Sequence, residues 1–302
     1  MAIKVEKKVK TKISLLNHES AVLCKVSSNP GFPQFLEFLE TPSYSYLVME
    51  CLGPNLETLK STAGGTFSLK TVVVIGCQIL ERLKTLHDVG FVHRDIKPEN
   101  FLVDLHSHNT IYLIDFGLCT FYLSQKNHTA DDETKRDVVA NQQEPLKNCE
   151  ELEKKLVGSS IGAQLNNEQP LQFLAGNTRL IGTMRYASLN SHLGMVASRR
   201  DDLESLAYVL IYFYKGVLPW QNIYSKSPEE QGDAILKKKE EGEEELCRGL
   251  PNQFKVFLKY VKLLKSQEKP DYNHLRQILL EVLRESEREE DLTFEWCRRK
   301  EG

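Results

Sequence analysis

Two short motifs constrain this sequence more than any other feature. The first is His93-Arg94-Asp95-Ile96-Lys97-Pro98-Glu99-Asn100, and the second, about fifteen residues further on, is Asp115-Phe116-Gly117. Together they place two acids, a lysine and an asparagine among apolar residues of the kind that form strands. A carboxylate can accept the proton of a hydroxyl group, and carboxylate and amide oxygens suit a magnesium ion. This combination of residue types fits the transfer of a phosphoryl group from ATP to an alcohol.

Each residue of the two motifs receives one role. Asp95 is the candidate catalytic base, which accepts the proton of a hydroxyl group and orients it towards the γ-phosphate. Lys97 neutralises charge on the moving phosphoryl group. Asn100 and Asp115 supply oxygen ligands for Mg²⁺. Taken singly, such residues are more often surface charges or turn residues, so the assignment depends on their combination.

Composition narrows the class of protein. The chain has 302 residues, which suits one large two-lobed domain or two small ones. Its net charge of −3 argues against nucleic acid as a partner. The seven cysteines are scattered without a CxxC pair, which favours reduced thiols over a disulfide framework or a zinc site. The charged start of the chain does not resemble a signal peptide, and no apolar run reaches membrane-spanning length. We therefore expect a monomeric protein of the cytoplasm or nucleus, without a membrane span.

Hydrophobic periodicity predicts strands at the start of the chain and helices later. Strands are expected over 2–6, 35–39, 44–51, 101–103 and 111–114. Helices are expected over 11–26, 69–88, 202–214, 254–264 and 272–283. The polar stretch from about 123 to 178 is interpreted as an insertion with a short helix near 150–157, and the acidic run 240–245 as solvated.

Lys4 and Glu19 are a candidate pair. Lys4 lies in Ala2-Ile3-Lys4, which is close to the V-A-I-K strand motif whose lysine holds the α- and β-phosphates of ATP. Glu19, on the following helix, is its predicted partner, because an ion pair would fix the lysine and align the helix. The alternative is that both are solvated surface charges.

With these residues, the chain resembles the casein kinase 1 family of serine/threonine protein kinases over nearly its whole length, the insertion excepted. In this family Ser-Ile-Asn replaces the Ala-Pro-Glu that ends the activation segment of most protein kinases, and Ser188-Leu189-Asn190 stands in its place here. Other motifs that carry the resemblance are Val9-Lys10-Thr11-Lys12, His18-Glu19-Ser20, Leu52-Gly53-Pro54, the run from Phe91 to Leu102, Ser198-Arg199-Arg200-Asp201-Asp202, Pro219-Trp220-Gln221 and Pro270-Asp271-Tyr272.

The resemblance implies an α+β fold with two lobes that fills residues 1–302. Residues 1–49 would form a partial, strand-rich small lobe, 50–55 the hinge, and 56–302 the mainly helical large lobe. ATP and Mg²⁺ would be the cofactors, and proteins with Ser or Thr, often acidic or already phosphorylated, the substrates.

Further site residues follow from the resemblance alone. Met49 would be the gatekeeper, and Glu50 and Leu52 would offer hinge backbone groups to adenine. Ala2, Leu102 and Ile114 would sandwich the base, although Met49, Leu102 and Ile114 are equally compatible with plain core. Asp202 would bind the backbone of the catalytic loop. Arg185, together with Lys238 in the run 237–239, would bind an anionic group of the substrate; a solvated helix face is the alternative for that run.

Two departures from the family leave alternatives open. The family has a glycine-rich hairpin before the strand at which this sequence starts. The sequence is therefore expected to be a truncated form of an active enzyme or a pseudokinase that acts as a binding module. The insertion is expected to be an inert spacer or a partner-docking loop, with Thr129, Thr134 and Thr178 as candidate phosphorylation sites. A small-molecule kinase of the same fold is a further alternative.

Overall fold

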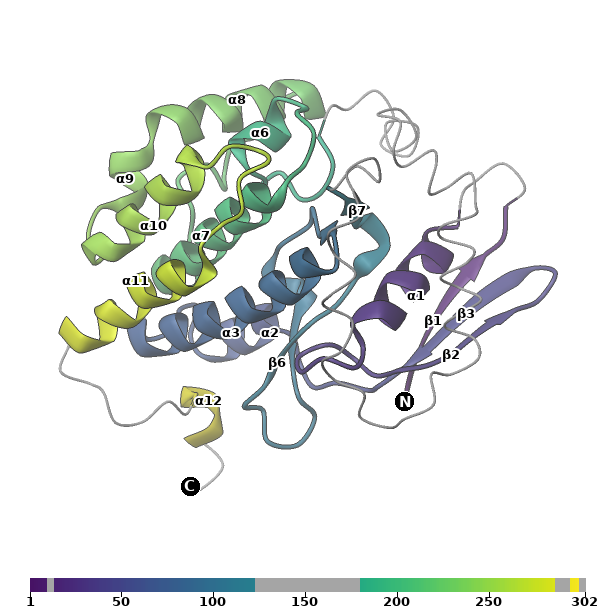
Figure 1. Ribbon diagram of the computed structural model, residues 1–302. Helices are drawn as coiled ribbons and strands as arrows, with labels where there is room; N and C mark the ends of the chain where they lie inside the picture. Colours follow the sequence, from purple (N-terminus) through teal and green to yellow (C-terminus); the bar gives the residue numbers. More distant parts are fainter. Residues whose placement is uncertain (10–13, 123–179, 286–293, 299–302) are drawn as a thin grey trace, which may run out of the picture.

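The computed structural model describes residues 1–9, 14–122, 180–285 and 294–298, and its first part is an antiparallel sheet with one helix (Figure 1). The strands are β1 (Ala2–Lys7), β2 (Phe35–Glu40) and β3 (Tyr44–Met49), in the order β1-β3-β2. Helix α1 (Leu15–Val26) contacts all three strands. In β1, Ala2, Lys4 and Glu6 are half-buried and alternate with exposed residues, as the period of a strand requires.

Helix α1 begins at Leu15, where two side chains cap its first turn; residues 11–13 of the predicted helix lie outside the described residues. The Ser14 hydroxyl accepts a hydrogen bond from the Asn17 N–H. The Glu6 carboxylate, from β1, accepts the N–H groups of Leu15 and Leu16 at 3.3 and 3.2 Å. These groups would otherwise lack partners, and a negative charge at a helix N-terminus is favourable. The carboxylate therefore ties the sheet to the helix.

The second part of the chain is mainly helical. Its helices are α2 (Leu56–Thr62), α3 (Leu69–Asp88), α6 (Leu189–His192), α7 (Arg199–Lys215), α8 (Pro228–Glu241), α9 (Glu243–Cys247), α10 (Asn252–Leu263), α11 (Tyr272–Glu285) and α12 (Glu295–Arg298). Helix α7 is buried along most of its length and packs against α3 and α10, while α11 packs against α3 and α10. In α3, a Cβ at Gly76 would lie 2.7 Å from Leu279 Cδ1, so the small residue permits this close packing.

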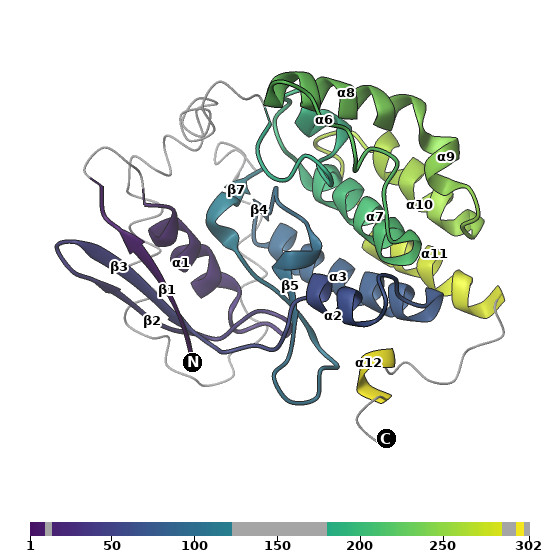
Figure 2. The same cartoon turned by 180° about the vertical axis from the view of Figure 1, so that it is seen from behind.

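Two short strand pairs lie between the sheet and the helices, as both views show (Figures 1 and 2). Strand β4 (Phe91–Val92) pairs with β7 (Thr120–Phe121), and β5 (Phe101–Val103) pairs with β6 (Ile111–Leu113). The two candidate motifs follow β4 and β6 directly. The strand pairing therefore brings the two motifs towards the border between the sheet and the helical part.

The acidic run 240–245 is solvated as expected, since Glu240, Glu241, Glu244 and Glu245 are exposed. It spans the end of α8 and the first turn of α9, and the glutamates in the first turn of α9 suit the dipole of that helix. Helices α2, α6, α9 and α12 were not predicted, and α8 was considered only as a helix face over 237–239. The predicted insertion 123–178 and its helix near 150–157 lie outside the described residues. In the part of the chain that the structure describes, no helix has the length and apolar character needed to cross a membrane.

The cysteines also differ from expectation at one position. Cys24, in α1, is disulfide-bonded, so the expectation of reduced thiols throughout is wrong there. No disulfide is formed by Cys51, Cys77, Cys119, Cys247 or Cys297. Burial raises the pKa of Cys119 well above its ordinary value, so this thiol is unreactive and acts as a small apolar side chain.

Asp104 organises the turn between β5 and β6. Its carboxylate accepts hydrogen bonds from the N–H groups of His106, Ser107, Asn109 and Thr110, and from the Ser107 hydroxyl. Partial burial raises the pKa of Asp104, but these hydrogen bonds together lower it far below its ordinary value.

We expect Asp104→Ala to lower the free energy of unfolding by about 1–2 kcal/mol at pH 7, because several N–H groups lose their acceptor. The folded-state pKa lies below the unfolded value of about 3.9, so the stabilisation is present above that pH and is lost as the pH falls further. Urea denaturation of both proteins from pH 3 to 7 measures this difference. A constant difference over the whole range would contradict the role of the charge.

Candidate active site

Hydrogen bonds of backbone groups and of the side chains of His93 and Asn100 bring the two motifs together. His93 Nε2 donates to the Ile114 carbonyl at 3.0 Å, and its Nδ1 accepts the Asp95 N–H at 3.3 Å. The Ile114 N–H donates to the Asn100 carbonyl at 3.0 Å. The Asn100 amide nitrogen donates to the Asp95 carbonyl at 2.8 Å. Asp95, Asn100 and the residue before Asp115 therefore form one connected unit.

The Asp95 carboxylate is buried and has partners from two segments. Lys97 Nζ forms an ion pair with Oδ2. Oδ1 accepts the N–H of Thr183 at 2.9 Å and the Thr183 hydroxyl at 2.8 Å. Thr183 was not recognised from the sequence, since it lies 88 positions from Asp95 and only folding brings the two together.

Gly182 allows the Thr183 segment to approach the catalytic loop. Its φ is +92°, and a Cβ at this position would lie 2.3 Å from the Arg94 carbonyl oxygen. A residue with a side chain would therefore be strained in conformation and would also collide with the loop. Glycine is required here for the contact between Thr183 and Asp95.

Lys4, Glu19 and Asp115 meet at the border of the sheet. Lys4 Nζ lies 2.5 Å from Glu19 Oε1 and 3.5 Å from Asp115 Oδ1. Burial raises the pKa of Glu19, and the nearby ammonium of Lys4 opposes this rise. The ion pair predicted from the sequence is thus present, and it connects β1, α1 and the second motif.

Asp202, on α7, binds the backbone at the start of the catalytic loop, residues 93–100. Asp202 is 1% exposed, and its carboxylate accepts the N–H groups of His93 and Arg94 at 2.7 and 2.9 Å. It also accepts His87 Nε2 at 2.9 Å, while Tyr272 Oη lies 2.6 Å from His87 Nδ1. The Arg94 backbone has φ of 69°, an uncommon conformation for a residue other than glycine, and these hydrogen bonds hold it.

The residues expected around adenine surround the connection between the sheet and the helices. Ala2 pairs with Met49 across β1 and β3, and Leu102 lies opposite Asn55. Met49 is buried, whereas Ala2, Leu52, Leu102 and Ile114 are half-buried and retain accessible surface. The N–H of Glu50 is already bonded to the Gln34 carbonyl at 3.0 Å, so the Glu50 carbonyl is the backbone group it can offer.

The residues present fit a magnesium ion bound together with phosphates. The Asp115 side chain is 44% exposed, and its carboxylate is the kind of ligand that Mg²⁺ prefers. The Asn100 amide nitrogen donates to Asp95, which leaves the amide oxygen as an acceptor. No group of three or more His, Cys, Asp or Glu side chains in the described ranges could hold a metal ion. Mg²⁺ needs only one or two protein ligands when phosphates and water complete its shell.

Of the two residues expected to form an anion site, Lys238 lies on α8 and Arg185 lies in the segment before α6. Lys238 Nζ forms an ion pair with Glu245 Oε2 at 2.6 Å on the exposed side of α8. Its neighbour Lys239 is buried and contacts the segment that carries Arg185, so the alternative of a solvated face is wrong for Lys239. The Arg185 guanidinium lies over the Tyr186 ring, 5.8 Å from its centroid.

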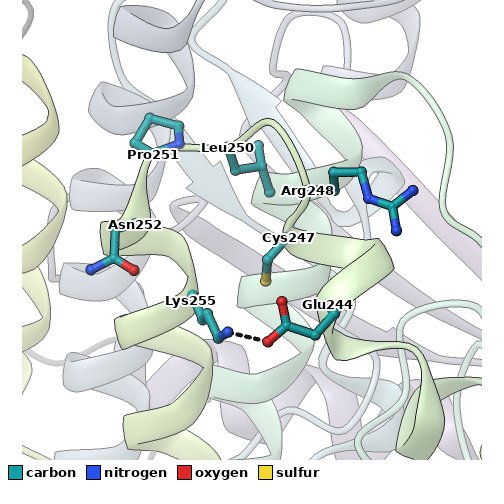
Figure 3. Close-up of a pocket in the computed structure, with 7 residues that line it drawn as sticks. All are labelled: Glu244, Cys247, Arg248, Leu250, Pro251, Asn252 and Lys255. Carbon is teal, nitrogen blue, oxygen red and sulfur yellow. Dashed lines mark hydrogen bonds and ion pairs between the residues drawn. The ribbon is translucent and has the colours of Figure 1, made fainter.

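A pocket of about 240 Å³ lies apart from these residues, between α9 and α10 (Figure 3). Its lining includes Cys247, and Glu244 and Lys255 form an ion pair across it. None of the candidate site residues lines it. The pocket is therefore separate from the candidate active site.

Comparison with known families agrees with this geometry. The family model described as Protein kinase domain matches residues 1–141. The matched range includes β1, α1, both motifs and the strands that carry them. The chain thus has the α+β, two-lobed fold of a protein kinase domain, with a small β-sheet region and a helical part, and the match supports a protein kinase.

Proposed function

We propose that this protein is a serine/threonine protein kinase that transfers the γ-phosphate of ATP to hydroxyl groups of protein substrates. The observation that carries the proposal is the Asp95 carboxylate, which Thr183 and Lys97 hold beside Asn100. A carboxylate oriented in this way is suited to accept a hydroxyl proton. Residues 50–55 serve as the hinge between the two lobes, and the protein acts as a monomer in the cytoplasm or nucleus.

The residues of the site have two separate roles, which are accepting the substrate proton and neutralising phosphate charge. Two donors of Thr183 bind Asp95 Oδ1, which leaves Oδ2, beside Lys97, to take the proton of the substrate. Lys97 stabilises the negative charge that develops on the transferred group. Lys4, fixed by Glu19, holds the non-transferred phosphates. Asp115 and Asn100 would hold Mg²⁺, which when bound would neutralise phosphate charge.

Membership of the casein kinase 1 family is part of the proposal. Its support is the anchoring of Ser188-Leu189-Asn190, the segment that replaces Ala-Pro-Glu. The Ser188 hydroxyl and the Asn190 amide donate to Asp201 Oδ1 at 2.7 and 3.2 Å, and the Leu189 N–H donates to Glu204. Arg185 precedes this segment and would favour substrates with acidic or phosphorylated residues.

The test is an assay of the full chain with Mg–ATP and labelled γ-phosphate. Casein and an acidic serine peptide are compared with choline and an aminoglycoside as acceptors, and Mg–ATP affinity is measured by calorimetry. Transfer to Ser or Thr of the proteins supports the proposal. Transfer to the small alcohols alone would establish a small-molecule kinase, and ATP binding without any transfer would establish a non-catalytic module.

We expect Lys4→Met to raise the KM for ATP by about tenfold, because a charge-assisted contact to phosphate is worth about 1.5 kcal/mol or more. The KM for the protein substrate should change little. Lys8→Met is the matched control, since Lys8 follows the same strand but pairs with Glu40 at 2.8 Å. An unchanged ATP KM in Lys4→Met would remove Lys4 from the nucleotide site.

A further inference from the structure

Lys239, near the end of α8, has an unusually buried ammonium group. The side chain is 1% exposed, in contrast to Lys238 beside it. Nζ donates to the carbonyl oxygens of Met184 and Ala187 at 3.0 and 2.6 Å, and it lies 3.2 Å from His192 Nε2. Since an ammonium has three N–H groups, these three acceptors satisfy it completely.

The groups around Lys239 fit this arrangement. Burial lowers the pKa of His192 to about 3, so its imidazole is neutral and Nε2 can accept. Burial also lowers the pKa of Lys239 below its ordinary value, while the carboxylate of Glu204 on α7 opposes this and Lys262 on α10 adds to it. The ring of Tyr208 lies 4.9 Å from Nζ and adds a favourable cation–π contact.

The acceptors of Lys239 belong to the turn that holds the catalytic base. The N–H groups of Tyr186 and Ala187 both donate to the Thr183 carbonyl, at 3.0 and 3.1 Å, so residues 183–187 form one hydrogen-bonded turn. At one end of this turn, Thr183 binds Asp95. On the side of the helices, Lys239 binds the carbonyls of Met184 and Ala187.

The Arg185 carbonyl, near the centre of the turn, also has a side-chain donor. Trp220 Nε1 donates to the Arg185 carbonyl at 2.7 Å, and the Trp220 ring lies 5.1 Å from Lys239 Nζ. Lys239 and Trp220 therefore both donate hydrogen bonds to backbone carbonyls of the turn 183–187. Loss of either donor would leave a buried carbonyl without a partner, which the turn can relieve only by moving.

We propose that Lys239 is a positioning residue for phosphoryl transfer, which acts by holding the turn 183–187 so that Thr183 orients Asp95 and Arg185 faces the substrate. This inference rests on the proposed kinase function. Lys239, the third lysine of the run 237–239, thus supports the segment that binds the substrate but does not contact the substrate itself. The nucleotide-binding residues lie on other elements, so the effect should be confined to the protein substrate.

The test compares Lys239→Met with Lys259→Met, an equal change at an exposed lysine on α10. With active sites counted by binding of an ATP analogue, we expect kcat/KM for an acidic peptide to fall on the order of tenfold to a hundredfold in Lys239→Met. The peptide KM should rise and the ATP KM should stay unchanged. A merely structural role would reduce the number of active sites and leave the peptide KM unchanged, which would overturn the proposal, as would an equal effect in Lys259→Met.

Amide hydrogen exchange gives a readout that does not require activity. We expect the amides of Tyr186 and Ala187 to exchange at least about tenfold faster in Lys239→Met than in the wild type. If the wild type transfers no phosphate, the proposed function fails. Amide exchange still tests whether Lys239 stabilises the turn 183–187. Unchanged exchange in a folded Lys239→Met would overturn the positioning role.

If Lys239→Met does not fold, Trp220→Phe carries the same test, because it removes only the N–H donor to the Arg185 carbonyl and keeps an aromatic ring. Faster exchange of the turn together with a raised peptide KM supports the proposal. Wild-type values of both would contradict it.

Discussion

Replacement of Asp95 by asparagine is expected to lower kcat by about 10²–10⁴-fold, the usual contribution of a general base. The asparagine has nearly the same shape and keeps one oxygen that can accept the Thr183 hydrogen bonds, so the turn 183–187 stays in place. It cannot take a proton from a hydroxyl group at neutral pH. The measurement is steady-state transfer to casein or an acidic peptide, with Mg–ATP affinity by calorimetry.

Two comparisons make this result specific. Mg–ATP affinity should change little in Asp95→Asn, because the nucleotide is held by other residues. Asp88→Asn is the control, since Asp88 is an exposed carboxylate at the end of α3 that pairs with Lys84. Wild-type turnover in Asp95→Asn would refute the assignment of the base, and a similar loss in Asp88→Asn would point to a general effect of lost charge.

Local spacing accounts for what the sequence predicted well. Asp95, Lys97 and Asn100 belong to one short motif, so their closeness in space follows from their closeness in the sequence. The ion pair of Lys4 and Glu19 joins a strand and the helix that follows it, and the short connection limits where the helix can lie. The main helices and strands also agree with their hydrophobic periodicity, because each buries one face or is buried throughout.

Residues that depend on distant packing were missed or placed wrongly. Thr183 has no local signal, since its role exists only where the chain returns to the catalytic loop. Lys239 lies in a run of lysines followed by glutamates, a composition typical of a solvated helix face. It is buried because inward-facing carbonyls of residues 184 and 187 need a donor, and this need cannot be seen before the tertiary structure is known.

The second large effect is expected at Asp202, because its carboxylate accepts several buried hydrogen bonds from the segment before Asp95. Asp202→Ala should lower the free energy of unfolding by about 3–5 kcal/mol, because the N–H groups of His93 and Arg94 and the imidazole of His87 lose their acceptor in a dry interior. The loop before Asp95 would loosen as well, so turnover per folded molecule should fall. Urea denaturation gives the first quantity and active-site-normalised kinetics the second.

The pH dependence of this effect distinguishes the charge of Asp202 from its packing. Burial raises the pKa of Asp202, but the hydrogen bond from His87, the electrostatic effects of His87 and His93, and the His93 N–H together lower it below its ordinary value. A folded-state pKa below the unfolded value of about 3.9 means that the stabilisation is present above that pH and is lost as the pH falls further. The wild type should therefore lose stability below about pH 4 more steeply than Asp202→Ala. Asp233→Ala, at an exposed carboxylate on α8, should leave the slope unchanged. Equal slopes for the wild type and Asp202→Ala would show that Asp202 stabilises the loop by packing and not by its charge.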